Sequence, residues 1–182
     1  MLKRFAKLDA TIAIFEKWVL AWGILLMAAN SIANVFGRYL FNQSIYFSEE
    51  LNQFLIVLVT FVGLGYAARQ GRHIRMSAVY DQLPDRGRKA LMIVICALTA
   101  AIMFLLAYYA VSYLGIVADL GKVTPALQIP LYLTYLWVPV GFTITGIQYV
   151  LAIVQNLRKD GVYISYSEID RYETPDTPEA GL

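Results

Sequence analysis

Four long runs of uncharged, mostly apolar residues follow one another along the chain, separated by segments rich in charged side chains. The runs cover residues 18–37, 51–68, 90–118 and 123–157 and contain 20, 18, 29 and 35 residues. A helix rises about 1.5 Å per residue, so about 20 residues cross a hydrocarbon core of about 30 Å. Because proline is tolerated in a first helical turn, the last helix is expected to start near Pro130. The pattern predicts an all-α integral membrane protein with four transmembrane helices, at about 18–37, 51–68, 90–113 and 130–155.

Composition points to the same class of protein. Of 182 residues, 59% are hydrophobic and 15% are charged, and the mean hydropathy is +0.57. Soluble domains are about 45–50% apolar and about 25% charged. A chain this short cannot surround four hydrophobic helices with polar ones, so we expect the lipid bilayer to do so. The net charge of +2 does not suggest a nucleic-acid partner.

The basic residues predict how the helices are oriented. Thirteen of the 15 Lys and Arg residues precede the first run, follow the last, or lie between the second and third. The positive-inside rule then places both termini in the cytoplasm (N-in/C-in). The domain organisation becomes a cytoplasmic segment at 1–17, the four-helix membrane domain at 18–157 and a cytoplasmic tail, expected to be mobile, at 158–182. Between the second and third helices, Met76 to Leu83 has the apolar spacing of a short interfacial helix.

Each predicted helix carries one face of small and polar residues. Such faces allow helices to approach closely in lipid. They could hold the four helices together, or they could face a partner subunit. The members are Gly23, Met27, Asn30, Asn34 and Gly37 in the first helix; Asn52, Ile56, Thr60, Gly63 and Ala67 in the second; Cys96, Ala100, Met103, Ala107 and Ala110 in the third; and Thr134, Gly141, Thr145, Gln148, Ala152 and Gln155 in the fourth.

The spans lack the residues that most membrane chemistry needs. None of the four predicted spans contains Asp, Glu, His, Lys or Arg, which ion and proton pathways usually use. His73 is the only histidine, which argues against a bis-histidine haem site, and Cys96 is the only cysteine, so a dithiol centre lacks its second thiol. We expect no catalytic residue, no metal site and no cofactor in this chain, which would therefore not be an enzyme.

Two charged clusters and one proline are the candidate contact sites. Ser48, Glu49 and Glu50 open the second helix, where they could cap it or meet a partner. Two adjacent glutamates at a membrane boundary need water or a cation, for which Arg38 is the nearest candidate along the chain and a residue of a partner subunit is another. Arg69, Gly71, Arg72, His73 and Arg75 mark the end of that helix, where they could simply retain the loop in the cytoplasm. Pro139 frees the carbonyl of Tyr135, so a kink is expected there.

Several short motifs occur in a recognisable order. They are Phe47-Ser48-Glu49-Glu50-Leu51, Val62-Gly63, Ala67-x-Arg69-x-Gly71-x-His73-Ile74, Leu83-Pro84, and Pro125-Ala126-Leu127-x-Ile129-Pro130 continuing through Tyr135 to Pro139-x-Gly141. In this order and spacing the chain resembles the small membrane subunit, of DctQ type, of tripartite ATP-independent periplasmic (TRAP) transporters. It departs from that pattern at Phe47, where the family often has Trp, and at Ser77, where the family often has an acidic residue.

The resemblance implies a subunit of a secondary transporter in the bacterial cytoplasmic (inner) membrane. A periplasmic substrate-binding protein would deliver an organic anion to a large membrane subunit that uses the sodium gradient. The present chain would bind and support that large subunit, with the two charged clusters fixing its orientation. The alternatives are a membrane anchor of a redox complex and a small channel made of several copies. The sequence does not identify the transported substrate.

Overall fold

The computed structural model describes residues 2–70 and 84–158, with side chains described from residue 11 except at 85 and 86. The helices are α1 (Leu2–Phe41), α2 (Ser48–Arg69), α4 (Asp85–Asp119), α5 (Leu131–Tyr135) and α6 (Trp137–Arg158). A single antiparallel bridge joins Val123 to Pro130 within these ranges. The interfacial helix predicted at Met76 to Leu83 lies outside the described residues.

Four helical stretches are long and apolar enough to cross a membrane, as predicted. They are Thr11–Phe41, Ser48–Arg69, Gly87–Asp119 and Leu131–Arg158. The 40 residues of α1 and the 35 of α4 correspond to lengths of about 60 and about 52 Å, so both helices exceed a hydrocarbon core of about 30 Å. The fold class is therefore all-α, with four membrane-spanning stretches.

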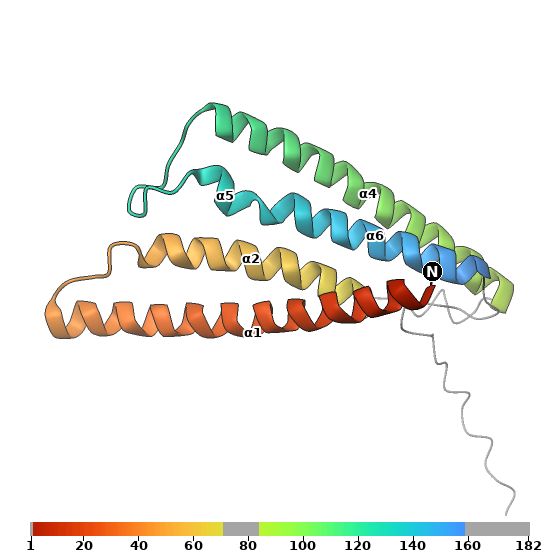
Figure 1. The fold of residues 1–182 in the computed structure, drawn as a ribbon, viewed down its shortest axis with the longest axis horizontal. Helices are drawn as coiled ribbons and strands as arrows, with labels where there is room; N and C mark the ends of the chain where they lie inside the picture. The colour runs from red at the N-terminus through yellow and green to blue at the C-terminus, as the bar shows by residue number, and fades with distance from the viewer. Residues whose placement is uncertain (1, 71–83, 159–182) are drawn as a thin grey trace, which may run out of the picture.

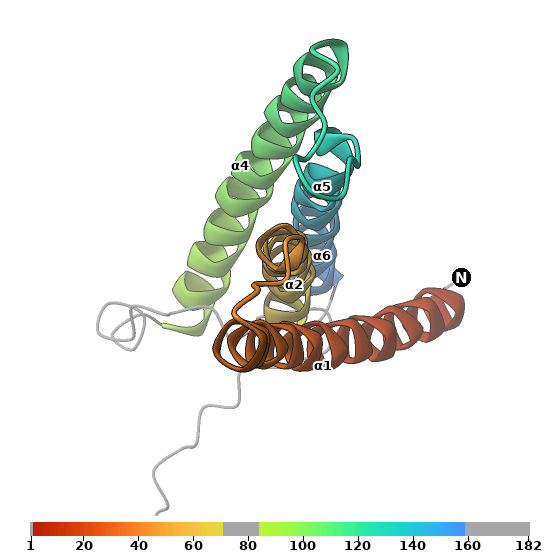
Figure 2. The same cartoon turned by 90° about the vertical axis from the view of Figure 1, so that its left-hand side faces the viewer.

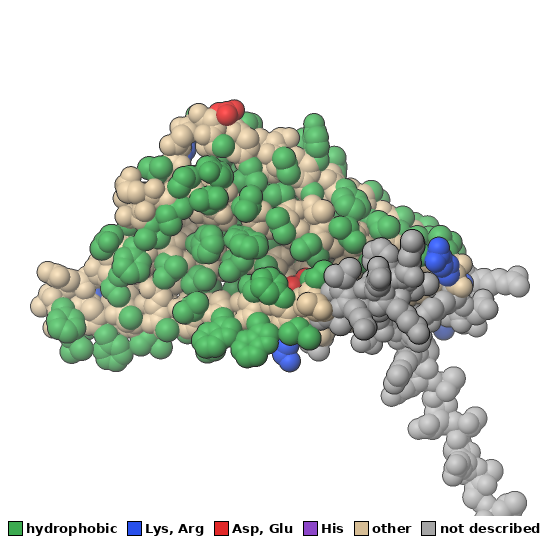
Figure 3. All heavy atoms as spheres, in the orientation of Figure 1, with side chains coloured by type: hydrophobic (Ala, Val, Ile, Leu, Met, Phe, Trp, Pro, Cys, Tyr) green, Lys and Arg blue, Asp and Glu red, His purple; other side chains and the backbone are tan. Residues whose placement is uncertain are grey.

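The long helices form a row in the order α1, α2, α6, α4. Helix α1 packs on α2, α2 on α6, and α6 on α4 (Figure 1). Figure 2 shows that α1 and α4 incline to opposite sides of the central α2 and α6 pair. The end of the row that holds the loop 42–47 and the connection 120–130 is called the loop end below. Apolar side chains cover much of the molecular surface, as lipid-facing helices require (Figure 3).

A glycine permits close approach at each contact along this row. A Cβ on Gly23 of α1 would stand 2.6 Å from Cγ2 of Val59 in α2. On Gly141 of α6 it would stand 2.5 Å from the carbonyl oxygen of Phe61 in α2, and on Gly146 it would stand 3.0 Å from the Phe104 ring in α4. A larger side chain at Gly141 would clash with the Phe61 backbone, and one at Gly23 or Gly146 would require the Val59 or Phe104 side chain to shift.

The fourth span is interrupted where Pro139 predicts a kink. Helix α5 ends at Tyr135, the residue whose carbonyl Pro139 cannot bind, and α6 begins at Trp137. Pro139 itself is buried, so the interruption lies inside the row of helices.

The four predicted small and polar faces differ in how deeply their residues are buried. Every predicted residue of the α6 stretch is buried, and those of α1 and α4 are buried or half-buried. These three faces therefore pack within the chain, which was one of the two alternatives. The small and polar face predicted for α2 divides: Asn52, Gly63 and Ala67 are half-buried, whereas Ile56 and Thr60 are exposed. The buried positions of α2 are Ser48, Leu55, Gly65, Ala68 and Arg69.

Candidate functional site

A buried ion pair joins α1 to the end of α2. Nη2 of Arg69 lies 3.4 Å from Oε1 of Glu16, and the two side chains are only 5% and 4% exposed. Arg69 was a predicted contact residue, and its guanidinium contacts a residue of its own chain. Two opposite charges can remain buried because each lowers the cost of removing the other from water.

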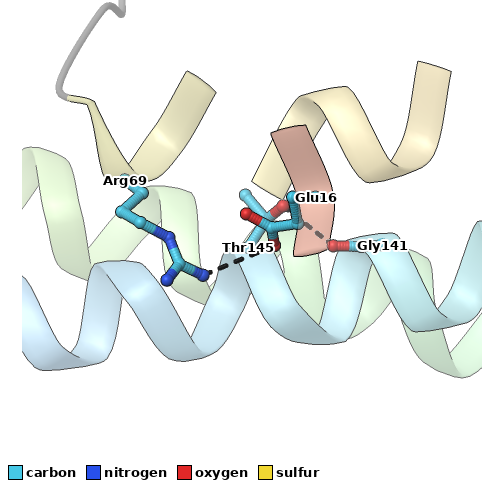
Figure 4. Close-up of polar contacts among 4 residues, drawn as sticks. All are labelled: Glu16, Arg69, Gly141 and Thr145. Carbon is cyan, nitrogen blue, oxygen red and sulfur yellow. Dashed lines mark hydrogen bonds and ion pairs between the residues drawn. The ribbon is translucent and has the colours of Figure 1, made fainter. Parts of the chain in front are cut away.

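The ion pair lies where α1, α2 and α6 meet. A Cβ on Gly65 of α2 would stand 3.3 Å from Oε1 of Glu16 and 3.2 Å from Cγ2 of Ile144 in α6. Gly65 thus leaves the space that the Glu16 carboxylate occupies. Figure 4 shows Glu16 and Arg69 beside the α6 segment in which the fully buried Thr145 donates a hydrogen bond to the Gly141 carbonyl, at 2.8 Å. Thr145 thereby satisfies its hydroxyl within its own helix.

Amide side chains join α1 and α2 toward the loop end. Nδ2 of Asn30 donates to the Ser48 carbonyl and to Oδ1 of Asn52, both at 2.9 Å. Nδ2 of Asn52 donates to Oγ of Ser31 at 3.1 Å. Oδ1 of Asn34 accepts a hydrogen bond from the Ile45 amide at 2.8 Å, which ties the loop 42–47 to α1. The predicted α1 face is thus a polar contact with α2.

At the loop end, Glu50 binds the connection that leads to α5. Its carboxylate accepts hydrogen bonds from the backbone N–H groups of Ala126 at 2.6 Å and Leu127 at 2.8 Å. The connection is closed upon itself by the Thr124 amide, which donates to the Ile129 carbonyl at 2.9 Å. Glu50 is thus the α2 residue that holds this loop in place.

The neighbouring candidates behave differently from prediction in two respects. Ser48 does not cap α2: the N-cap residue is Phe47, no side chain caps the helix, and Ser48 is buried. Arg38 does not neutralise the glutamates, since within the described ranges no ion pair joins it to either one; its guanidinium lies 5.3 Å from the Tyr39 ring centroid. Glu49 is exposed.

The other predicted contact residues are Pro139 and the four candidates that follow Arg69. Pro139 is buried at the interruption of the fourth span. Gly71, Arg72, His73 and Arg75 lie outside the described residues.

Charged side chains occur near the ends of the four stretches. The acidic and basic residues within them are Glu16, Lys17, Arg38, Glu49, Glu50, Arg69, Arg88, Lys89, Asp119 and Arg158. Between these positions every helix crosses with uncharged side chains. In the described part of the chain, no three His, Cys, Asp or Glu side chains are grouped as metal ligands would be. The arrangement is suited to holding helices and loops together.

Glu16 was not singled out from the sequence, although a signal for it exists. It lies just before the first uncharged run, and Arg69 lies just after the second. Consecutive spanning helices are antiparallel, so these two positions belong to the same end of the helix pair. The contacts Asn30 to Asn52, Gly23 to Val59 and Glu16 to Arg69 indeed follow one another in antiparallel order along the two helices.

Comparison with known proteins identifies the family. Residues 27–159 match the family model of the tripartite ATP-independent periplasmic transporters, DctQ component. This chain belongs to the DctQ family. The matched region contains Asn30, Glu50, Arg69 and Pro139, whereas Glu16 lies before it.

Individual relatives of this DctQ-family chain are transporter permease proteins. It is 50% identical over 170 residues to the ectoine TRAP transporter small permease protein TeaB of Halomonas elongata, covering 93% of this chain and 88% of TeaB. It is 31% identical to the C4-dicarboxylate TRAP transporter small permease protein DctQ of Vibrio cholerae, over 50% of this chain and 40% of that protein. The family makes this chain a small permease subunit of a TRAP transporter, a membrane transport protein and not an enzyme.

A third relative has a different chain organisation. The isethionate TRAP transporter permease protein DctMQ of Oleidesulfovibrio alaskensis is 26% identical over 75% of this chain, and the match covers 22% of that protein. The region similar to this chain is therefore a small part of a much longer permease polypeptide.

Proposed function

We propose that this chain is the accessory subunit that binds and supports the large membrane subunit of a TRAP-type secondary transporter. It lies in the bacterial inner membrane with both termini in the cytoplasm. The large subunit uses the sodium gradient, and a periplasmic substrate-binding protein delivers the substrate to the assembled complex. The observation that carries the proposal is membership of the DctQ family over residues 27–159.

The distribution of charge supports a supporting role. Uncharged side chains fill the middle of every spanning stretch, so the chain offers no row of titratable groups from one membrane surface to the other. The buried charges are at one end, where Glu16 and Arg69 neutralise each other. Ion coupling is therefore assigned to the partner.

The basic residues support the orientation. Lys17, Arg69, Arg88, Lys89 and Arg158 all lie at the helix ends opposite the loop end. Positively charged residues favour the cytoplasmic surface. The loop end, with Glu49 and the Glu50-bound connection, then faces the periplasm.

The DctMQ relative supports a large permease partner. In that protein, the region similar to this chain shares one polypeptide with a much longer sequence. The covalent link in DctMQ is compatible with a noncovalent complex between this chain and a separate large subunit. For the substrate we propose a small organic solute with an anionic group, and ectoine is the first to test because of the 50% identity to TeaB.

The proposal is tested by affinity purification of the tagged chain after co-expression with the large TRAP subunit from the same genome. We expect the large subunit to elute with the chain in detergent. An unrelated four-helix membrane protein with the same tag serves as the control. If the large subunit elutes equally from both proteins, or from neither, this chain does not bind it.

A further inference from the structure

One face of α2 remains open although α2 lies inside the row of helices. Its centre consists of Gln53, Ile56 and Thr60, which recur at the spacing of one helix face and are all exposed. Ile56 is 53% exposed. We call these three residues the α2 face. Because α1 and α6 pack on other sides of α2, the row itself does not cover it.

The polar side chains of the α2 face lack the hydrogen bonds that comparable side chains in these helices form. Within residues 11–70 and 84–158, neither the side-chain amide of Gln53 nor the hydroxyl of Thr60 forms a hydrogen bond. Other amides of α1, α2 and α6 do form them, and so do the hydroxyls of α4 and α6 nearest the surface. Those amides are Asn30, Asn34, Asn52 and Asn156. Those hydroxyls belong to Thr99, Ser112 and Thr143, and each donates to the backbone carbonyl four residues earlier.

Lipid is a poor neighbour for such groups. Hydrocarbon offers no hydrogen-bond partner, so an amide or hydroxyl in a membrane is better satisfied by another helix. The small and polar faces predicted for α1, α4 and α6 already pack within the chain. The residues of the α2 face, in contrast, remain exposed beside the other described helices of this chain.

We propose that the α2 face receives a transmembrane helix of the large TRAP subunit. That helix would present small residues opposite Ile56 and a hydrogen-bonding side chain or free backbone carbonyl near Gln53 or Thr60. This inference rests on the proposed function, because it takes the large subunit as the partner. The DctMQ relative, in which the similar region is part of a longer permease chain, favours this occupant over a second copy.

Site-specific photocrosslinking in the co-expressed complex tests the placement. The photoreactive amino acid p-benzoylphenylalanine replaces Ile56 in one variant and Leu25 in the other. Leu25 is a matched control: it is 60% exposed on α1, and the neighbouring contacts of Gly23 with Val59 and of Asn30 with Asn52 place it at a similar depth. After irradiation, the Ile56 variant should shift by the mass of the large subunit, and the Leu25 variant should not.

A second variant protects the test against misfolding of the first. Thr60→Val removes the hydroxyl while keeping the branched shape of the side chain and should reduce the amount of large subunit recovered, whereas Leu25→Ala should not. If the large subunit elutes with the unsubstituted chain but position 56 crosslinks only lipid or a second copy, the α2 face is not the interface and the proposed function stands. If the large subunit does not elute with the unsubstituted chain, the proposed function itself fails, and the α2 face with it.

Discussion

The Arg69 guanidinium lies 3.4 Å from the Glu16 carboxylate across 53 residues of sequence, and both side chains are almost completely buried. The pair holds α1 against α2 at the end opposite the amide contacts of Asn30 and Asn52. Since α1 packs mainly on α2, the polar contacts near both ends determine how α1 is attached to the rest of the chain.

Removing one member of this pair should therefore be costly. Glu16→Gln takes the carboxylate charge away from the buried Arg69 guanidinium, and loss of one partner of a buried pair costs about 3–5 kcal/mol. The free energy of unfolding of the purified protein in detergent measures the effect. Lys17→Gln, at the exposed neighbouring position, is the control. Equal stability of the two variants would show that the ion pair does not hold α1.

Replacing both charges should be less damaging than replacing one. The double variant Glu16→Leu with Arg69→Met removes both charges of the pair together, and apolar replacements of buried pairs are often neutral or stabilising. We expect its unfolding midpoint to lie above that of Glu16→Gln. A midpoint at or below that of the single variant would argue against charge compensation as the function of the pair.

Glycines at the contacts between helices should tolerate alanine according to the space beside them. Gly141→Ala would bring a methyl group against the Phe61 backbone and should destabilise the protein by about 1–3 kcal/mol. Gly115 lies in α4, where an added Cβ would meet no atom within 4 Å, so Gly115→Ala should be neutral or stabilise by up to about 1 kcal/mol. Thermal unfolding compares the two. Similar losses would mean that the α2 to α6 distance is not limited by Gly141.

The amide contact between α1 and α2 can be measured by a double-mutant cycle. Asn30→Ala and Asn52→Ala each remove one side of their 2.9 Å hydrogen bond. Side-chain hydrogen bonds between membrane helices contribute about 0.6 kcal/mol on average and up to about 1.7 kcal/mol. We expect a coupling energy in this range from unfolding in mixed detergent. Strictly additive losses would contradict a direct bond.

The two adjacent glutamates should differ in their effect on the connection 120–130. Glu50→Gln retains only one carbonyl oxygen for the Ala126 and Leu127 amides, so both amides should exchange hydrogen with solvent faster. Glu49→Gln, at the exposed position, should leave their exchange unchanged. Hydrogen exchange followed by mass spectrometry of this segment distinguishes the two. Equal exchange rates in both variants would show that Glu50 does not hold the connection and acts only as a charge at the start of α2.

The helices were predictable because lipid imposes a simple requirement on sequence. Charge-free runs of suitable length identify four spans, and Pro139 predicts the interruption that separates α5 from α6. The small and polar faces of α1 and α6 were also identified, since their spacing repeats with the helical period.

The contacts made by charged residues were harder to predict. Charges beside a span can be explained by orientation alone, and Arg69 was buried by a helix that the local pattern does not specify. Glu50 binds Ala126, which is 76 residues away, and no periodicity encodes such a distance. The exposure of Ile56 and Thr60 could not be predicted either, because the small and polar face to which they belong resembles the faces that pack within the chain.

The most direct measurement is substrate uptake by proteoliposomes that contain the large TRAP subunit and the periplasmic binding protein, with and without this chain. An inward sodium gradient and radiolabelled ectoine, with a C4-dicarboxylate as the second substrate, provide the assay. The account predicts uptake only when this chain is present, and no sodium-driven uptake by this chain alone. Full uptake without the chain would contradict a supporting role, and uptake by the chain alone would show that it is a transporter itself.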